Sequence, residues 1–577
     1  MGRRLPYGIS HFPTIRQGQY LFVDHTEYIR RFEDLASHIV FVRPRRFGKS
    51  LWLSILEHYY DLRFAEHFDE LFGGLAIADE PTPLHNQFLV LRFDFSAIHR
   101  SATEADTERS FGARVASNVA SFLATHRRWL GDVDGLLARL AGLDEPLSAL
   151  DLAIHAALVA ELPVMVLVDE YDTFANELIA THQEQRYAAL VRGTGLLKTF
   201  FKAIKEATSI GVVARSFLTG VSPLLLDDIS SGFNIAMNPS LRLSFGTALG
   251  FCQNEVAELF GQVFRRAGPS AVPSDEELHA LMVNWYNGYR FHPAAEAVFN
   301  PDMVLYFLSH LADGQLPTTL LDSNLRTDLA KLQMLVRKGA ELGALLSLLE
   351  REHALPMQVQ SAFGIERLSD SENFHSLLFY LGLLTYTASE RPALRIPNYV
   401  ARTLYWDELR RVVAAELQLD PSGALRDALA ALMERGEGEA FFELARVQVL
   451  SRLSQRDFLH FNEASLKSVL LSLLSLSQAL SVFSEWEVGR GYADLVLVPM
   501  PQATWLRHAW MVELKYLKRK QDSAAAREQA LATGRAELAR YLADESRMSY
   551  LGRYQVHAAV ALFVGSDELV WSAFEYQ

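Results

Sequence analysis

The residues Gly48, Lys49 and Ser50 stand between an apolar run and a stretch whose apolar residues recur at helical spacing. A lysine and a hydroxyl at the start of a helix can bind the outer phosphates of a nucleotide and a magnesium ion, because backbone N–H groups and the helix dipole attract anions there. The loop departs from the general phosphate-binding consensus at Arg43, where that consensus has its first glycine, and at Pro44, which has no N–H to donate. Gly-Lys-Ser alone is therefore weak evidence for a nucleotide site.

A pair of acidic residues, Asp169 and Glu170, ends the apolar run VMVLVDE. An aspartate at the end of a buried strand can hold the shell of a magnesium ion, and the glutamate that follows can orient or deprotonate water. Taken alone, the pair is equally compatible with a solvated strand end. In combination with the Gly-Lys-Ser loop, it favours a nucleotide-hydrolysing site.

Other polar residues near these motifs allow two interpretations each. Thr219 ends another apolar run and is either a sensor of the γ-phosphate or a turn residue that caps the next segment. Arg45 and Arg46 are candidates for contact with phosphate or a partner, with a solvated basic turn as the alternative. Arg290, in NWYNGYRF, could reach the nucleotide, but a packed aromatic turn around Gly288 is the favoured interpretation.

A second group of chemically capable residues lies near the C-terminus, where Asp494 opens a β-branched run and VELKY supplies Glu513 and Lys515. Side chains two positions apart in a strand point to the same face, so Glu513 and Lys515 are neighbours if this segment is a strand. Two carboxylates can share a magnesium ion while the lysine lies beside the attacking water, which suits phosphodiester hydrolysis. An ordinary salt-bridged strand pair is the alternative, and it is favoured for Glu-Leu-Lys taken alone.

Apolar strands and amphipathic helices alternate through the first part of the chain, which predicts a parallel sheet covered by helices on both faces. The strands are expected at 37–43, 88–96, 162–172 and 209–220, and two of the helices at 103–126 and 198–207. We therefore predict an α/β domain over residues 1–246.

The remainder divides into a mostly helical region over residues 247–440 and a small α/β domain over residues 441–577. In the small domain, the pattern predicts a helix near 463–483, a strand or hairpin at 482–499, a strand at 509–517, a helix at 521–543 and a last strand at 556–564.

The composition is that of a folded, soluble protein of several domains, with 577 residues, half of them apolar, and a formal net charge of −14. This charge argues against a surface that attracts nucleic acid everywhere, so any contact with a phosphate backbone is expected to be local. The single cysteine, Cys252, excludes an internal disulfide and a cysteine-based zinc cluster, which fits the cytoplasm. The longest apolar stretch, at 468–483, is short and interrupted by polar residues, so a buried helix is favoured over a membrane span.

The N-terminal motifs resemble the AAA-ATPase-like family of bacterial and archaeal proteins. The resemblance is carried, in order, by RPRRFGKSLWLSIL, VLVDEYDTF, FLTGVSPLLLDDISSGFN and NWYNGYRF, and in that family Arg43 is usual. It implies a P-loop NTPase sheet of the AAA+ or ASCE type that binds ATP. The implied ATP-binding residues are Arg45, Arg46, Phe47, Gly48, Lys49, Ser50, Asp169 and Thr219, with Ser50 and Asp169 on magnesium and Glu170 as the catalytic glutamate.

The C-terminal motifs EWEVGRGYADLVLVP and AWMVELKYLK resemble the PD-(D/E)XK nuclease domain, a small restriction-endonuclease-like α/β fold that this ATPase family commonly carries. The resemblance implies a catalytic trio of Asp494, Glu513 and Lys515, with both carboxylates on magnesium. It also implies Glu463 as a metal ligand from the first helix and Gln529 as a helical glutamine near the site.

Together the two resemblances imply an ATP-regulated nuclease that uses Mg²⁺, with Mn²⁺ also possible, and acts on DNA or RNA. The expected protein is cytoplasmic, with a role in anti-phage defence or mobile-element biology, and it is a candidate homo-oligomer. The alternative is an NTP-dependent switch or scaffold that binds nucleic acid or protein through an inactive nuclease fold.

Overall fold

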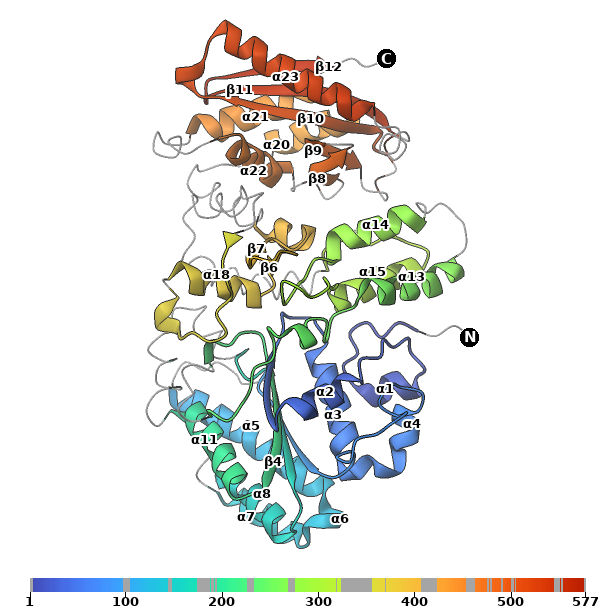
Figure 1. The fold of residues 1–577 in the computed structure, drawn as a ribbon, viewed down its shortest axis with the longest axis vertical. Coiled ribbons are helices and arrows are strands. Elements are labelled where there is room, and N and C mark those ends of the chain that lie inside the picture. The colour runs from blue at the N-terminus through green and yellow to red at the C-terminus, as the bar shows by residue number, and fades with distance from the viewer. Residues whose placement is uncertain are drawn as a thin grey trace.

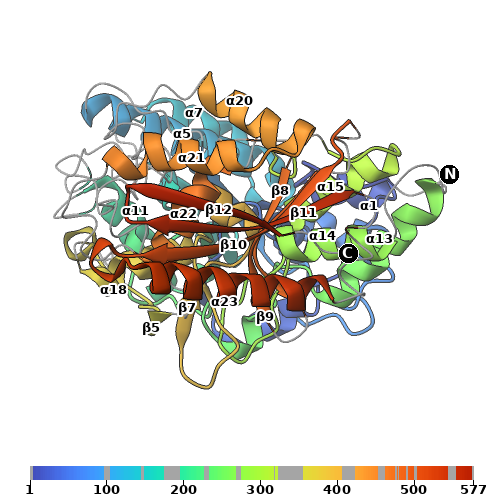
Figure 2. The same ribbon diagram turned by 90° about the horizontal axis from the view of Figure 1, so that it is seen from above.

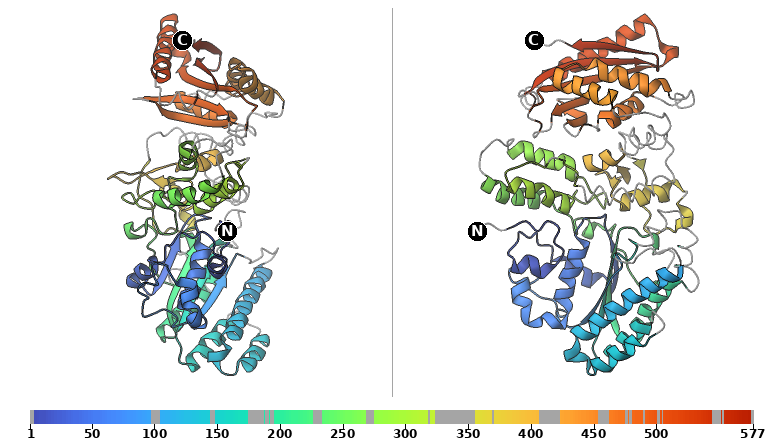
Figure 3. Two further views of the ribbon diagram at one scale, coloured as in Figure 1. Left: turned by 90° about the vertical axis from the view of Figure 1, so that its right-hand side faces the viewer. Right: turned by 180° about the vertical axis from the view of Figure 1, so that it is seen from behind.

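The computed structural model arranges the chain in successive tiers, with the N-terminal α/β part at one end of the long axis and the C-terminal sheet at the other (Figure 1). The view from the side and the view from behind show the same order (Figure 3). The residues described are 4–96, 104–143, 148–173, 187, 191, 195–225, 233–267, 275–317, 319–322, 355–368, 370–405, 423–452, 462–474, 477, 480–488, 491–499, 503, 505–543, 551 and 554–574.

The N-terminal tier is built on a parallel sheet of four strands in the order β1-β4-β3-β2. The strands are β1 (His38–Val42), β2 (Leu89–Asp94), β3 (Val164–Asp169) and β4 (Val213–Gly220). All four were predicted from their apolar runs, and β1 and β3 are buried along their whole length. Strand β4 lies between the strand before the Gly-Lys-Ser loop and the strand that ends in Asp169, which confirms the predicted P-loop fold class.

Helices cover both faces of this sheet, as the alternating apolar pattern predicts (Figure 1). Along β1, Ile39 and Phe41 pack into one core and Val40 and Val42 into the other. The first face is covered by α1 (Phe12–Gln17), α2 (Tyr28–Leu35), α3 (Lys49–Tyr60), η1 (Leu62–His67) and α4 (Phe68–Phe72). The second is covered by α5 (Glu104–Thr125), α6 (Arg127–Leu130), α7 (Val133–Ala141), α8 (Ser148–Val159) and α11 (Leu196–Ser209).

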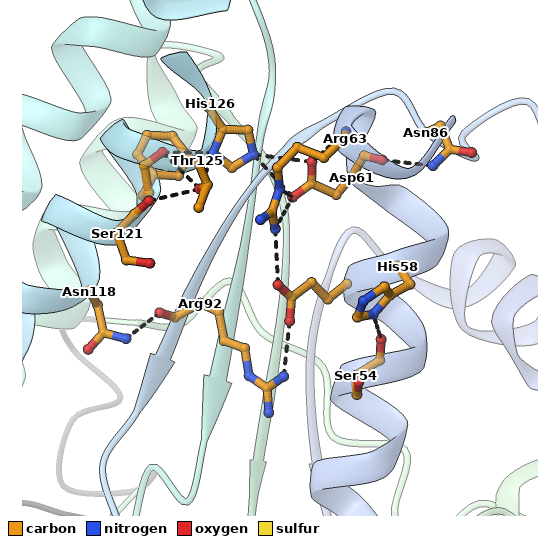
Figure 4. A network of polar contacts seen from close by, with 12 residues as sticks. Ser54, His58, Asp61, Arg63, Asn86, Arg92, Asn118, Ser121, Thr125 and His126 are labelled. Carbon is orange, nitrogen blue, oxygen red and sulfur yellow. Dashed lines mark hydrogen bonds and ion pairs between the residues drawn. The ribbon is translucent and has the colours of Figure 1, made fainter. Parts of the chain in front are cut away.

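A buried polar network ties α3 to the sheet and to the opposite layer of helices (Figure 4). Asp61 and His126 are fully buried, and both carboxylate oxygens of Asp61 lie 3.1 Å from Nε2 of His126. Arg63 donates to Asp61, and Glu57 on α3 accepts from Arg63 at 3.1 Å and from Arg92 on β2 at 3.0 Å. Burial raises the pKa of Asp61, but hydrogen bonds from His126 and Arg63 outweigh it, and the net pKa is lowered.

The middle tier is mostly helical, as predicted, but it also contains a small antiparallel sheet in the order β5-β7-β6. These strands were not expected from the sequence because each has only two or three residues. The elements are η2 (Leu243–Phe245), α13 (Gln253–Ala267), α14 (Asp275–Tyr286), α15 (Pro301–Ala312), β5 (Leu355–Pro356), η3 (Ile365–Arg367), α18 (Ser371–Tyr380), β6 (Thr385–Tyr386) and β7 (Ala393–Arg395).

The C-terminal tier is a sheet of five strands in the order β12-β11-β10-β9-β8, in which only the pair β10 and β11 is parallel. Helix α23 covers one face, and α20 and α21 lie on the other side (Figure 2). The elements are α20 (Ala424–Ala430), η4 (Ala431–Arg435), α21 (Glu439–Gln448), η5 (Leu450–Arg452), α22 (Glu463–Leu474), β8 (Leu480–Val488), β9 (Gly491–Pro499), β10 (His508–Leu517), η7 (Arg519–Gln521), α23 (Ala524–Leu542), β11 (Gln555–Val564) and β12 (Glu568–Phe574).

Two predictions for this tier were wrong in detail. The helix expected near 463–483 ends at Leu474, and residues 480–483 already belong to β8, because the β-branched and aromatic residues there pair with β9. The strand expected to be the last is followed by β12, an edge strand whose residues are mostly half-exposed and which therefore lacks a strong apolar signal. None of the described helices has both the length and the apolar character that a membrane span requires.

The segment around η4 and α21 packs against the C-terminal sheet. The indole N–H of Trp510 on β10 donates to the carbonyl of Leu432 at 2.8 Å, and Phe442 packs on Trp571 of β12 with 5.0 Å between ring centroids. We therefore propose that the C-terminal unit begins at or before residue 423, and not at 441 as the sequence pattern suggested.

Arg43, at the end of β1, joins the first two tiers. Its guanidinium is 1% exposed and lies between the rings of Phe41 and Phe291, at 4.3 and 4.0 Å from their centroids. It donates to the carbonyls of Val42, Ser240, Phe245 and Ala248. Burial lowers the pKa of Arg43 to about 9, so the group still carries its charge at neutral pH. The residue that departs from the general consensus is therefore a structural anchor.

We expect Arg43→Leu to lower the stability of the N-terminal tier by roughly 3 to 5 kcal/mol, because it leaves several buried carbonyls without a donor. Calorimetric unfolding checks this. The matched control is Arg391→Leu at an exposed arginine, which should change stability by less than about 0.5 kcal/mol. An unfolding midpoint for Arg43→Leu equal to that of the control would contradict the anchoring role.

Candidate nucleotide and metal sites

The Gly-Lys-Ser loop has the backbone of a phosphate-binding turn. Gly48 is the N-cap of α3 with a φ of 82°, a left-handed conformation that glycine adopts without strain, and Lys49 is the first helical residue. The ammonium of Lys49 donates to the carbonyls of Arg43 at 3.0 Å and Pro44 at 2.9 Å, so the lysine lies over the loop. Burial lowers the pKa of Lys49 to about 8, although Glu170 and Asp169 oppose this shift.

A cavity of about 390 Å³ opens beside this loop, and its lining changes character from one part to another. Its polar lining comes from the loop, Glu170 and the start of α15. Its apolar lining comes from the N-terminal segment, from α3 and from the middle tier, and includes Pro6, Ile9, Leu21, Phe22, Val23, Leu51, Trp52, Ile55, Leu249, Phe251, Leu259 and Leu305. The volume lies within the range of small-molecule sites, and such a lining suits a ligand with an anionic part and a flat apolar part.

Of the predicted residues on this loop, Arg45, Arg46, Phe47, Gly48, Lys49 and Ser50 all line the cavity. The Arg46 guanidinium lies 3.1 Å from the carboxylate of Asp302 on α15, so this arginine contacts the middle tier. The ring of Phe47 is 1% exposed and packs edge-on against Tyr289 and Phe291, and the Phe47 side chain therefore serves packing.

The segment around Gly288 is the packed turn that was favoured over a nucleotide-binding role. Gly288 has a φ of 100°, and a Cβ there would stand 2.2 Å from the carbonyl oxygen of Pro397. The backbone N–H of Arg290 donates to Thr385 at 2.6 Å, and Arg290 does not line the cavity beside the loop.

The two acidic residues at the end of β3 differ in position: Asp169 is buried, and Glu170 lines the cavity. Asp169 is 4% exposed, accepts a hydrogen bond from Thr219 at 2.8 Å and lies 3.7 Å from Arg92. Thr219 is fully buried, and its hydroxyl positions the Asp169 carboxylate. Arg92 also pairs with Glu57 on α3, so it contacts both the helix after the Gly-Lys-Ser loop and Asp169 at the end of β3.

Of the two acidic residues at the end of β3, Glu170 is the one that lines the cavity. Its φ is 51°, a conformation that non-glycine residues adopt rarely, and its carbonyl accepts from the N–H of Thr173. Burial raises the pKa of Glu170, while the hydroxyl of Thr173 and the charge of Lys49 lower it. A carboxyl with a raised pKa beside a phosphate-binding loop is suited to accepting a proton from water.

Asp172 is a residue of this region that the sequence analysis missed. It is fully buried and accepts hydrogen bonds from the backbone N–H groups of Val221 and Ser222. A Cβ on Gly220 would lie 2.5 Å from Asp172, so the end of β4 is packed directly against it. The third acidic residue of VDEYD was a signal, but its partners could not be identified without the sheet order.

The predicted C-terminal trio comes together at the junction of β9 and β10. Asp494 accepts from the backbone N–H of Leu514 at 2.9 Å, and Lys515 donates to Glu513 at 3.0 Å. Glu513 is 3% exposed, and burial together with the neighbouring Asp494 raises its pKa to about 9 while Lys515 opposes the shift. The strand geometry predicted from Glu-x-Lys is therefore confirmed, and a carboxylate from the adjacent strand lies beside it.

Helix α22 brings Glu463 and Lys467 to the same cluster. Burial raises the pKa of Glu463. The charge of Lys515 lowers this pKa and that of Asp494 raises it, so Glu463 belongs to the same electrostatic cluster. Lys467 was not predicted; it is 7% exposed and its ammonium lies 3.0 Å from Asp494. Its position one helical turn after Glu463 was the available signal.

Helix α23 contributes a glutamate that the sequence analysis also missed. Glu537 lies 2.9 Å from the ammonium of Lys515. Burial lowers the pKa of Lys515, but Glu513, Glu537 and Glu463 outweigh it and the net pKa is raised. The predicted Gln529 is exposed on the same helix, about two turns before Glu537.

The carboxylates of this cluster fit a hard divalent cation. The second oxygen of Glu513 is buried without a hydrogen-bond partner, and Asp494 is near enough to raise the pKa of Glu513. Within the described ranges, no three acidic, histidine or cysteine side chains converge into a complete metal cage. Mg²⁺ commonly takes only one or two carboxylates and keeps several waters, so Asp494 and Glu513 suffice as ligands.

The N-terminal and C-terminal parts of the chain each match the model of a known protein family. Residues 6–230 match the family model described as "Predicted AAA-ATPase", and residues 461–569 match that of the PD-(D/E)XK nuclease superfamily. An uncharacterized protein encoded in the vnfD 5′ region of Azotobacter chroococcum mcd 1 is 27% identical over 424 residues, which cover 69% of this chain and 68% of that protein.

Among solved structures, a Walker-type ATPase of Pyrococcus abyssi aligns with a TM-score of 0.39 and 13% identity, over 67% of this chain and 96% of that one. The ORC1 protein of Aeropyrum pernix, solved in complex with DNA, aligns with a TM-score of 0.28 and 13% identity, over 69% of this chain and 96% of that one.

The raised pKa of Glu513 predicts a pH-dependent stability. The folded chain keeps a proton on Glu513 up to about pH 9, whereas an ordinary glutamate releases it near pH 4.5, so this group destabilises the fold progressively as pH rises between those values. In EDTA, Glu513→Gln should therefore unfold at a higher temperature than the wild type at pH 8, with the difference shrinking towards pH 5. Thermal unfolding across this pH range measures the effect. Parallel curves for Glu513→Gln, the wild type and the exposed-site control Glu528→Gln would exclude it.

Proposed function

We propose that this chain, which joins a predicted AAA-ATPase to a PD-(D/E)XK nuclease-superfamily domain, hydrolyses ATP and uses that cycle to control metal-dependent cleavage of DNA or RNA. The observation that carries the proposal is the presence of two separate groups of polar side chains in one chain. One lies at the cavity beside Lys49, and the other consists of Asp494, Glu513 and Lys515 on neighbouring strands.

In the first site, different residues bind the phosphates of ATP, hold the metal ion and accept the proton of water. Lys49 and the N-terminus of α3 bind the phosphates, and Ser50, which lines the cavity, would hold Mg²⁺ together with Asp169 at the end of β3. Glu170 takes the proton of the attacking water, and Thr219 keeps the Asp169 carboxylate oriented. Arg45 and Arg46 supply positive charge where Pro44 lacks an N–H, and the apolar part of the cavity receives the base.

In the second site, Asp494 and Glu513 would hold Mg²⁺ or Mn²⁺, and such an ion would supply the activation of water by lowering its pKa. Lys515 lies on the same strand face as Glu513 and stabilises the negative charge that builds on the phosphate. Glu537 and Glu463 keep Lys515 protonated and in place, since both raise its pKa. Gln529 is exposed and is assigned to the approach of the nucleic acid.

Contacts between the loop and the middle tier support control of one site by the other. Arg46 pairs with Asp302 of α15, and Phe47 packs on Tyr289. A Cβ on Gly382 would lie 3.0 Å from Pro44, so the loop also touches the segment after α18. A phosphate that attracts Arg46 competes with Asp302, and its arrival or loss therefore acts directly on the middle tier.

The proposed biological role follows from the chemistry of the two sites. A nuclease held under ATP control suits a cytoplasmic defence or mobile-element system, in which cleavage must be withheld until a trigger arrives. A homo-oligomer is included in the proposal because ATPases of this class often complete the site with an arginine from a neighbour.

Lys49→Ala should reduce ATP hydrolysis by at least about 100-fold, because it removes the only loop ammonium that lines the cavity. Phosphate release by the purified full-length chain measures this, with the thermal midpoint recorded to confirm folding. Lys202→Ala, at an exposed lysine on α11, is the matched control and should keep wild-type turnover. Undiminished hydrolysis by Lys49→Ala would remove the first half of the proposal.

Lys515→Ala should abolish cleavage of linear, circular and single-stranded substrates in Mg²⁺ or Mn²⁺ while leaving ATP hydrolysis intact. Assays with and without ATP, run on this variant, on Lys49→Ala and on Lys202→Ala, separate the two sites. Cleavage by the wild type that responds to ATP, and loses that response in Lys49→Ala, is the expected result. A wild-type chain that binds nucleic acid and hydrolyses ATP without forming products would instead establish the switch or scaffold with an inactive nuclease fold.

A further inference from the structure

Two arginines of the middle tier lie on either side of one strand of the small sheet. Arg395 ends β7 and stands opposite Thr385 of β6 in the register of that pair. On the other side of β6, the backbone N–H of Arg290 donates to the hydroxyl of Thr385 at 2.6 Å, and the carbonyl of Arg290 accepts from the N–H of Tyr386 at 3.2 Å. Arg290 and Arg395 are therefore held two strand spacings apart, with roughly 10 Å between their backbones.

A third arginine, Arg402, belongs to the helical segment at 399–405. This segment is fixed beside the turn that carries Arg290, because the side chain of Asn398 donates to the carbonyl of Asn287 at 2.7 Å. The three arginines come from separate parts of the sequence, and only the packing of the middle tier brings them together.

The three positive charges act on one another. Partial desolvation lowers the pKa of Arg395, and the charges of Arg290 and Arg402 lower it further. Partial desolvation also lowers the pKa of Arg290, and Glu296 is the carboxylate whose charge raises it. Within the described ranges, no carboxylate forms an ion pair with any of the three guanidiniums. The cluster therefore has an excess of positive charge, which a bound anion would relieve.

Solvent reaches all three arginines. Arg395 is exposed, Arg290 and Arg402 are half-exposed, and none of them lines the cavity beside Lys49. An open group of arginines suits a polyanion, because each guanidinium can donate two parallel hydrogen bonds to a phosphate and a polymer presents several phosphates at once. The formal net charge of the whole chain is −14, so this cluster is a local exception to a negative surface.

We infer that Arg290, Arg395 and Arg402 form a binding site for the phosphate backbone of a nucleic acid. The choice of nucleic acid as the polyanion rests on the proposed function, in which such a polymer is cleaved. Strands β6 and β7 lie in the middle tier, between the N-terminal tier and the C-terminal tier (Figures 1 and 3). A polymer bound there lies between the two proposed sites.

Binding is measured on the full-length chain in EDTA, which prevents metal-dependent cleavage. The probes are fluorescently labelled double-stranded DNA, single-stranded DNA and single-stranded RNA, and anisotropy is recorded over a series of salt concentrations. Arg395→Gln, at an exposed residue, should weaken binding about five- to eight-fold at about 0.1 M salt. It should also reduce the slope of log affinity against log salt by about 0.7 to 0.9, the value for one lost phosphate contact.

Matched variants separate charge from structure. Arg395→Lys keeps the positive charge and should keep the wild-type salt slope. The double variant Arg395→Gln with Arg402→Gln should lose about twice the slope that Arg395→Gln loses. Arg139→Gln, at an exposed arginine on α7, should bind as the wild type does. A thermal midpoint equal to that of the wild type establishes that each variant is folded.

The outcomes distinguish this site from the proposed nuclease activity. Wild-type affinity and salt slope in Arg395→Gln and in the double variant would overturn the inference, as would a wild-type chain that binds none of the three probes. If cleavage in Mg²⁺ or Mn²⁺ still depended on Lys515 in that case, the proposed function would stand. Loss of binding in the variants, without any cleavage by the wild type, would support the arginine site and refute the nuclease.

Discussion

The buried guanidinium of Arg43 is the interaction on which the first site depends. A charged group that is 1% exposed is tolerated only when its donors are satisfied, and here the four carbonyls it reaches belong to β1 and to residues 240–248. The rings of Phe41 and Phe291 cover its two faces. Because the carbonyls of Arg43 and Pro44 also accept from Lys49, the anchor fixes the loop that positions the lysine.

This arrangement explains how a loop can lose a glycine and an N–H and still keep the shape of a phosphate-binding turn. In place of a self-contained glycine-rich cradle, the loop is held from outside, by Arg43 beneath it and by the aromatic contacts of Phe47 beside it. The consequence is that the loop and the middle tier form one packed unit. A ligand that changes the loop must therefore also change its contacts with α15 and with the turn around Gly288.

The sequence was sufficient for the elements with the strongest patterns. Strands β1 to β4 were predicted within a few residues because their apolar runs are continuous, and Glu513 and Lys515 were placed on one face by strand periodicity alone. The edge strand β12 was missed because a half-exposed strand has no such run.

The roles of Arg43 and Phe47 could not be predicted, because their partners lie some 200 residues or more away in sequence and are brought near only by the tertiary fold. Glu537 and Lys467 were missed for a related reason: their partners Lys515 and Asp494 are closer in sequence but lie on strands of the sheet, and only the packing of α23 and α22 on that sheet brings them together.

The C-terminal cluster contains more carboxyl groups than ammonium groups. Among the residues that the structure describes, four carboxyl groups, those of Glu463, Asp494, Glu513 and Glu537, face two ammonium groups, those of Lys467 and Lys515. Burial makes the excess of negative charge costly, and the raised pKa of Glu513 shows how the chain alone relieves it, by retaining a proton. A divalent cation between Asp494 and Glu513 would relieve the same excess without a proton and would release Glu513 to act as a ligand. Metal binding and deprotonation of Glu513 are therefore expected to be coupled, which ties the second site to both metal concentration and pH.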